Sequence, residues 1–236
     1  GKSLGYLIPV LVNTALTGER ALISTYTNHL ARQLAEKDGE RASNAVEAVL
    51  GKKLHLRTRM GRRNFVDLER IGEFQSLLRS DGNHNSANAL DAWIDHAPET
   101  FYEAREERGL VLPADVNETD LCLTGSSSST TTAAYDRHRA AAEGADVIVT
   151  NHAVTLLDAK LWNRLLGGEN HDIRLAVFDE ADMLPSMARS MSQSRVALYP
   201  LMDLARDSGT RGYIGRIQDV KSKLPALEET IRFMLI

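Results

Sequence analysis

Apolar positions follow a helical spacing in several long segments of the chain. Residues 4–17 carry apolar side chains three and four positions apart, and Gly18 follows as a stop signal. The same spacing covers residues 28–38, ends at Gly39, and resumes in a segment that reaches Leu50. These patterns predict three helices near the start of the chain.

Short, almost continuous apolar runs lie between the helical segments. They cover residues 21–23, 146–150 and 175–178, and residues 53–58 are expected to form a further strand. Such runs are typical of parallel strands that are buried on both faces. The alternation therefore predicts an α/β fold, with helices on both faces of a parallel sheet and ligands at the carboxyl ends of the strands.

The middle of the chain has a different pattern. Between residues 64 and 144 it predicts mainly helices, at 64–80, 85–97 and 98–108. The serine- and threonine-rich tract 125–132 is expected to be a mobile loop, because it has too few apolar side chains to pack. Residues 187–236 again have a helical pattern. We expect the middle segment to be an insertion into the α/β domain.

Composition limits the class of protein. Of the 236 residues, 43% are hydrophobic and 25% are charged, as in ordinary soluble proteins. No apolar run approaches the ~18 residues of a membrane span, and no leader pattern opens the sequence. The single cysteine, Cys122, excludes an internal disulfide framework and a four-cysteine metal site. We therefore expect a cytoplasmic protein without a membrane partner.

Positive charge is concentrated in one stretch of an acidic chain. The net charge is −4, yet residues 51–63 hold six Lys and Arg and no acid, which leaves −10 elsewhere. Such a stretch could follow the phosphates of a nucleic acid, or it could be a solvated loop. Charge alone does not decide between these alternatives.

Two short motifs suggest a site for ATP and Mg²⁺. Gly1-Lys2-Ser3 matches the end of a P-loop, in which the backbone and Lys2 would bind phosphates and the Ser3 hydroxyl would bind Mg²⁺. Asp179 and Glu180 follow an apolar strand, where Asp179 would hold Mg²⁺ and Glu180 would orient or deprotonate the attacking water. A chance tripeptide and a helix cap are the alternative interpretations of the two motifs.

Taken together, these motifs resemble superfamily 2 DNA helicases of the DinG/XPD type. Asp179–Asp182 is similar to their DEAD/DEAH motif, residues 23–34 are similar to motif Ia, and residues 145–153 are similar to the strand and Asn-His turn that precede the DEAD motif. The resemblance implies a P-loop RecA-like sheet and catalytic roles for Lys2 and Glu180. It also implies contacts between single-stranded DNA and a set of polar residues: Thr25, Thr27, Arg62, Arg63 and Asn151.

One departure from the family pattern concerns its iron–sulfur cluster. Residues 61–67 are similar to the family segment that ends in the first cluster cysteine, but here that position is Asp67. Since a cluster of this kind needs four thiolates and the chain has one cysteine, we expect no cluster and an inert Cys122. In lacking the cluster ligands, the chain resembles the CRISPR-associated DinG of type IV systems.

The resemblance also implies a division into domains. Residues 1–60 and 145–186 would form the first motor domain, residues 61–144 the inserted helical domain, and residues 187–236 the start of an arch. The second motor domain, with its arginine finger, is expected to be missing, so that this fragment alone would be inactive.

The implied function is an ATP-dependent helicase that moves 5′ to 3′ on single-stranded DNA. It would take part in type IV CRISPR interference, with a ribonucleoprotein complex as its partner. The alternatives are a housekeeping DinG repair helicase and a noncatalytic scaffold that binds nucleotide or nucleic acid.

Overall fold

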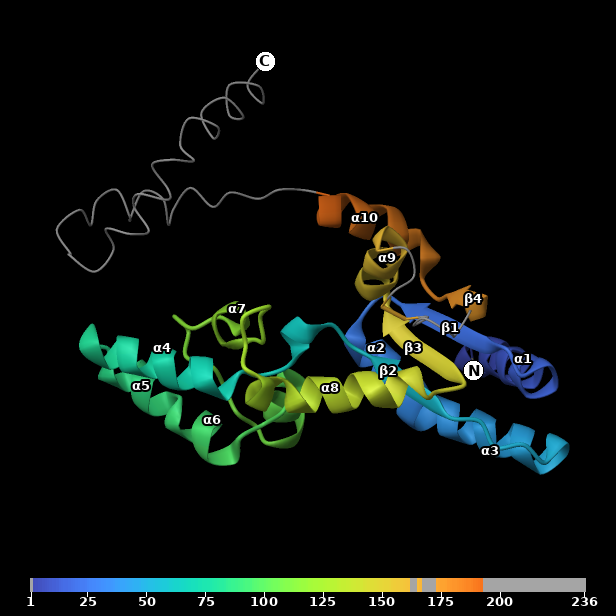
Figure 1. Ribbon diagram of the computed structural model, residues 1–236, viewed down its shortest axis with the longest axis horizontal. Helices are drawn as coiled ribbons and strands as arrows, with labels where there is room; N and C mark the ends of the chain where they lie inside the picture. The colour runs from blue at the N-terminus through green and yellow to red at the C-terminus, as the bar shows by residue number, and fades with distance from the viewer. Residues whose placement is uncertain (1, 162–164, 167–172, 193–236) are drawn as a thin grey trace, which may run out of the picture. The chain divides into compact units, whose positions relative to one another are not determined.

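The strands form a single parallel sheet in the part of the chain that the structure describes. The computed structural model describes residues 2–161, 165–166 and 173–192. Within these residues the strand order is β2-β3-β1-β4 (Figure 1). The strands are β1 (Arg20–Thr25), β2 (Leu56–Arg59), β3 (Val147–Asn151) and β4 (Ile173–Phe178). The predicted α/β fold with a parallel sheet is confirmed.

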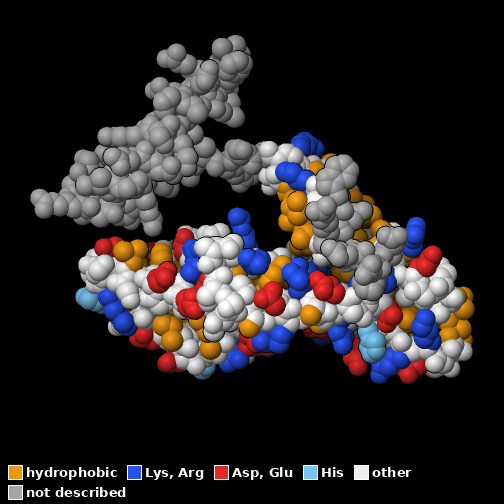
Figure 2. Space-filling view, in the orientation of Figure 1, with side chains coloured by type: hydrophobic (Ala, Val, Ile, Leu, Met, Phe, Trp, Pro, Cys, Tyr) orange, Lys and Arg blue, Asp and Glu red, His pale blue; other side chains and the backbone are white. Residues whose placement is uncertain are grey.

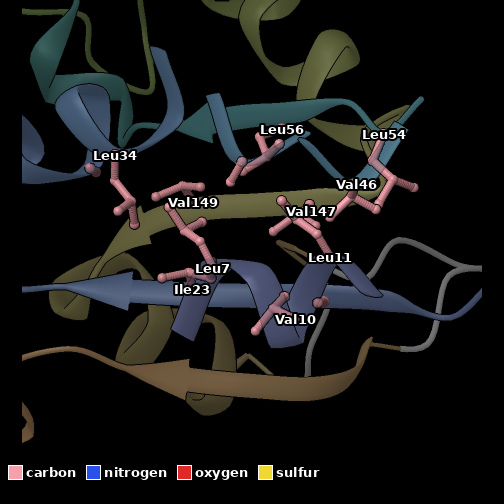
Figure 3. Packing of buried hydrophobic residues seen from close by; sticks show 13 residues of the cluster. Leu7, Val10, Leu11, Ile23, Leu34, Val46, Leu54, Leu56, Val147 and Val149 are labelled. Atoms are coloured by element: carbon pink, nitrogen blue, oxygen red, sulfur yellow. The ribbon is translucent and has the colours of Figure 1, made fainter. Parts of the chain in front are cut away.

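One face of the sheet packs against helices from the start of the chain. These are α1 (Lys2–Thr17) and a continuous helical segment made of α2 (Asn28–Gln33), a π-helical turn (Leu34–Asp38) and α3 (Gly39–Leu50). Figure 3 shows the resulting core, in which side chains of β1 and β3 meet those of the helices. Its members include Leu7, Leu11, Ile23, Leu34, Val46, Val147 and Val149.

The opposite face is covered by α9 (His152–Lys160). Leu22 of β1 and Ile148 of β3 pack there with Val154 and Leu166. Consecutive strand residues point to opposite faces, so the two cores use alternate positions of the same strands. The continuous apolar runs of β1 and β3 therefore reflect burial on both sides.

Gly39 does not end a helix, and this prediction was wrong. Its backbone is helical, with φ −66° and ψ −43°, and α3 continues directly from the preceding π-helical turn. A Cβ at Gly39 would lie 2.7 Å from the Leu34 carbonyl oxygen and 2.8 Å from a methyl group of Leu56. The glycine therefore permits close packing of the helix on β2 rather than stopping it.

The middle of the chain forms a helical region with its own core. The helices are α4 (Leu68–Ser80), α5 (His84–Ala89), α6 (Asp91–His96), α7 (Glu118–Leu121) and α8 (Ser129–Glu143), with a π-helical turn at Glu103–Glu107. Figure 1 shows α4, α5 and α6 grouped together. Trp93, Ile71 and Phe101 are buried in this core, which is separate from the cores against the sheet. The boundaries at residues 61 and 144 stay a prediction.

The second half of the serine- and threonine-rich tract is helical, contrary to the prediction of a loop over its whole length. Ser128 caps α8 by accepting a hydrogen bond from the Thr131 N–H, and the second half of the tract lies in that helix. The pattern-based assignment missed α8 because its first turn consists of Ser and Thr, which favour caps over helix interiors. Thr132 is buried, so even this polar segment contributes to packing.

The described chain ends in a short helix, α10 (Leu184–Ser192), which follows a 3₁₀ turn at Ala181–Met183. The predicted arch at 187–236 lies outside the described residues beyond residue 192. Gly1 of the predicted P-loop also lies outside them. Across the described ranges, no helix has the length and apolar character needed to cross a membrane.

Candidate functional site

The carboxyl ends of all four strands lie at the same edge of the sheet. Thr25 at the end of β1 is in register with Asn151 of β3, and Ser24 is in register with Phe178 of β4. On the other side of β3, Thr150 is in register with Arg59 of β2. The turns that follow these strands are therefore neighbours, although they come from distant parts of the sequence.

Lys2 and Asp179 meet at this edge. Lys2 Nζ lies 2.5 Å from Asp179 Oδ1, and the Tyr6 hydroxyl donates a hydrogen bond of 2.9 Å to Asp179 Oδ2. The Asp179 N–H donates to the Ser24 carbonyl at 2.8 Å, which fixes the turn to β1. The expected convergence of the two motifs is thus observed for Lys2 and Asp179.

The environment of Asp179 favours its ionised form. Burial opposes ionisation, but the hydrogen bonds from Lys2 and Tyr6 and the charge of Lys2 outweigh it, so the pKa of Asp179 lies below its ordinary value of 3.8. Burial, followed by the hydrogen bond to Asp179, raises the pKa of the Tyr6 phenol, which therefore stays a donor. The hydrogen bond to Asp179 and the charge of its carboxylate raise the pKa of Lys2.

These residues suit a phosphate-bound Mg²⁺ better than a metal held by protein alone. Ser3, in the first turn of α1, and Asp179 could supply a hydroxyl and one carboxylate, and Mg²⁺ commonly takes its remaining ligands from phosphates and water. In the described parts of the chain, no group of three or more His, Cys, Asp or Glu side chains is placed to hold a metal ion. The Lys2 side chain is 73% exposed and can leave Asp179 without disturbing the core.

Glu180 adopts a backbone conformation that is unusual for its residue type. Its φ of 56° and ψ of 44° lie in the left-handed region, which costs a residue with a Cβ roughly 1–2 kcal/mol. Its side chain is exposed, whereas its carbonyl accepts hydrogen bonds from the Met183 N–H at 3.0 Å and from His152 Nε2 at 3.3 Å. The conformation turns the Glu180 backbone toward the protein and leaves the carboxylate at the surface.

A chain of three asparagines joins the neighbouring turns. The Asn151 side-chain amide donates to the Asn28 carbonyl oxygen at 2.6 Å, and the Asn28 amide donates to the Asn64 oxygen at 2.6 Å. Asn64 in turn donates to the Gly61 backbone carbonyl at 2.9 Å, and Asn151 caps α9 by accepting from the Val154 N–H. The three segments that carry the residues predicted to contact DNA are therefore connected by hydrogen bonds.

The two threonines predicted to contact DNA occupy different environments. Thr25 is 2% exposed, and its hydroxyl donates to the Thr27 carbonyl at 2.9 Å. Thr27 is exposed and caps α2, with its hydroxyl accepting from the Leu30 N–H at 3.2 Å. Thr25 therefore shapes the turn from within, and Thr27 presents it to solvent.

The basic stretch is not a single surface. Arg59 is buried, and its guanidinium donates to the Tyr135 hydroxyl and to the Met60 carbonyl. Arg62 is partly buried and donates to the Thr124 carbonyl at 2.9 Å, whereas Arg63 is exposed. Figure 2 shows basic side chains interspersed with acidic ones on the visible face. A charge count along the sequence cannot separate a structural arginine from a free one.

Asp67, the last residue of the segment 61–67, has a structural role. It is 1% exposed and caps α4 by accepting from the Arg70 N–H at 3.2 Å. Its other carboxyl oxygen accepts from the Ser127 hydroxyl at 2.6 Å. Cys122 is buried and lies on the strand-like segment that pairs with Val66. Hydrogen bonds thus hold this corner of the inserted region together.

Several residues of this edge were missed as site residues in the sequence. Tyr6 lies four positions after Lys2 on the same helix, and this spacing places the two on one face. Ser24, Asn28 and His152 belong to segments that the family resemblance marks, but only contacts across the sheet show their partners. Asn64 lies in the segment 61–67 that resembles the family pattern, but only its contact with Asn28 shows that it belongs to this edge.

Comparison with known proteins adds independent information. No family model matches the chain. It is 26% identical to the ATP-dependent helicase DinG of Mycobacterium tuberculosis, over 87% of this chain and 33% of the relative. It is 26% and 28% identical to the ATP-dependent DNA helicase YoaA of Haemophilus influenzae and Escherichia coli, over 88% of this chain and 32% of each relative.

The chain thus spans about one third of the length of these relatives. The parallel sheet is also consistent with a RecA-like helicase domain. With Lys2 and Asp179 in contact at its carboxyl edge, the chain is similar to the DinG and YoaA helicases over most of its own length, at the level of distant homology.

Proposed function

We propose that this chain is the nucleotide-binding part of an ATP-dependent DNA helicase that moves along single-stranded DNA and unwinds duplexes. The contact between Lys2 and Asp179 carries the proposal, because it joins residues 177 positions apart at the carboxyl edge of a parallel sheet. This is the edge at which open α/β sheets bind ligands. The names of the similar proteins support the same activity.

In this proposal each residue of the edge has a defined role toward ATP. Lys2 exchanges its contact with Asp179 for a contact with the phosphates and neutralises their charge, next to the backbone of Gly1. Ser3 and Asp179 would hold Mg²⁺, and the ion would supply charge neutralisation at the phosphates. Glu180, whose carboxylate is exposed, orients or deprotonates the attacking water.

We also propose that a DNA strand lies along the turns that the asparagine chain connects. Thr27, Arg63 and Asn151 would contact its backbone, and such contacts require no particular base sequence. Thr25, which is buried, and Arg62, which is partly buried and donates to the Thr124 carbonyl, would hold these turns in place. The acidic net charge of the chain makes a local rather than a global attraction to DNA necessary.

A narrower proposal is that the protein acts 5′ to 3′ in type IV CRISPR interference and binds no iron–sulfur cluster. Its support is the replacement of the first cluster cysteine by Asp67 and the presence of a single cysteine. A housekeeping DinG helicase is the alternative, and the names of the similar proteins favour it. The iron content of the purified complete protein and the genes beside its own distinguish the two.

The test uses ATP hydrolysis by the complete protein, with and without single-stranded DNA. We expect Glu180→Gln to retain ATP binding and lose turnover, since the water would no longer be oriented or deprotonated. Glu19→Gln, the same change on an exposed residue just before β1 at the opposite edge of the sheet, serves as the control. Normal hydrolysis by Glu180→Gln contradicts the catalytic assignment, and a wild type without hydrolysis favours a noncatalytic scaffold.

A further inference from the structure

His152 is a buried residue that lies between the residues proposed to bind ATP and those proposed to contact DNA. It is 0% exposed and occupies the first turn of α9, directly after Asn151. Its Nδ1 lies 2.7 Å from the Ser24 hydroxyl, and its Nε2 lies 3.3 Å from the Glu180 carbonyl oxygen. None of the roles proposed above uses this side chain.

The partners of His152 define how its ring is used. A carbonyl oxygen can only accept, so Nε2 carries the hydrogen that is donated to Glu180. Nδ1 is then the acceptor, and the Ser24 hydroxyl donates to it. Thr155, one turn further along α9, lies 2.9 Å from the same hydroxyl and completes the buried group. The ring is therefore held at both nitrogens.

Glu180 depends on such support because its left-handed backbone is unfavourable for a residue with a side chain. Of the two groups that donate to its carbonyl, the Met183 N–H belongs to the turn that follows, and His152 comes from another strand connection. A shift of His152 would therefore move the Glu180 backbone relative to the sheet. The Glu180 carboxylate would move with it.

The other side of the same turn faces the proposed DNA strand. Asn151 caps α9 and is the first member of the asparagine chain that continues through Asn28 to Asn64. Asn151 and His152 are consecutive, so a displacement at Asn28 reaches the helix turn that carries the imidazole. The contacts form one continuous path from the turns that carry the asparagine chain to the Glu180 carbonyl.

We infer that His152 is a positioning residue that sets the backbone of Glu180 according to the state of the asparagine chain, and so couples DNA binding to ATP hydrolysis. The inference rests on the proposed helicase function. It assigns His152 no contact with ATP or DNA, and its effect is transmitted through hydrogen bonds and the first turn of α9.

The first test compares two substitutions in the complete protein. His152→Leu removes the donor, and we expect it to lower the DNA-stimulated kcat by about 10- to 100-fold, the scale of a small misplacement of a catalytic group. The KM for ATP should change by less than about 3-fold, because nucleotide binding is not altered. His152→Gln can donate from its amide, and should restore kcat to within about 3-fold of wild type.

Two further variants keep this comparison interpretable. His84→Leu, the same change on an exposed residue of α5, should leave kcat unchanged. If thermal unfolding shows that His152→Leu does not fold, Ser24→Ala takes its place, since it removes the hydroxyl that orients the ring. Ser24→Ala should lower kcat without a matching change in KM, and a wild-type kcat in a folded Ser24→Ala protein overturns the inference.

The coupling itself is tested by a double-mutant cycle with Asn28→Ala, which removes the middle of the asparagine chain. If the path acts as a unit, Asn28→Ala lowers stimulation by a dT oligonucleotide in the wild type but adds little to His152→Leu. If the fold-losses of DNA stimulation caused by Asn28→Ala and His152→Leu multiply in the double mutant, the two residues act independently and the inference is overturned. A wild-type kcat in His152→Leu also overturns it, provided that Glu180→Gln is inactive. A wild type without DNA-stimulated hydrolysis overturns the proposed function as well.

Discussion

Replacing Asp67 by Ala should destabilise the inserted region by an amount that can be worked out from its contacts. The substitution removes the cap on the Arg70 N–H, typically ~1 kcal/mol, and the acceptor for the Ser127 hydroxyl, about 1 kcal/mol more. The resulting loss of about 2 kcal/mol corresponds to a fall in melting temperature of about 4–8 °C for a unit of about 150–250 residues.

The assay is thermal unfolding of the complete protein, followed by circular dichroism. Asp67→Asn keeps one acceptor oxygen, and should lose less than half as much stability as Asp67→Ala. Asp81→Ala, at the other end of α4, is the matched control because Asp81 makes no side-chain cap. A fall below about 1 °C in Asp67→Ala, or an equal fall in Asp81→Ala, refutes the reasoning.

Three further predictions concern the pH dependence of stability, the salt dependence of DNA affinity, and ATP hydrolysis by residues 1–236 alone. Burial, followed by the charges of Arg59 and Arg32, lowers the pKa of His138 from 6.5 to about 4. The unfolded state therefore binds more protons between these values, and stability falls as pH drops from 6.5 toward 4. In His138→Gln, the free energy of unfolding measured with urea should depend less on pH between 6.5 and 4. An unchanged pH dependence contradicts the prediction. Arg63→Ala should reduce the salt slope of DNA affinity by about 0.7, measured by fluorescence anisotropy, whereas Arg41→Ala on α3 should not. Residues 1–236 alone should release phosphate at least about 10³-fold more slowly than the complete protein, because the arginine finger is expected outside this segment; equal rates would contradict this.

Much of the α/β core could be predicted from the sequence because its signals are local. The runs that became β1 and β3 are apolar at successive positions, and burial on both faces requires this. The run that became β4 was also predicted to be buried on both faces, but β4 lies at the edge of the described sheet and alternates partly buried with exposed residues. The helix that ends at Gly18 also followed from spacing and a single glycine, whose φ is 75°. The same reasoning was wrong at Gly39, because both the end of a helix and the close packing of a helix on a strand can require a glycine.

The residues of the candidate site also differ in whether a local sequence signal predicts them. Lys2, Asp179 and Glu180 could be named from their motifs because each follows from a short segment. The basic stretch could not be resolved, since the buried Arg59 and the exposed Arg63 have the same charge in the sequence.

Sequence by itself determined which segments end in polar residues after a buried strand, since strand burial and turn chemistry are properties of a few consecutive residues. Only the tertiary structure decided which of those ends are neighbours, because strand order follows from packing across the sheet. The contacts of Tyr6 with Asp179, of His152 with Glu180, and of Asn28 with Asn64 and Asn151 all depend on that order. Hydrogen bonds act over about 3 Å, so partners far apart in the chain become visible only when the fold brings them together.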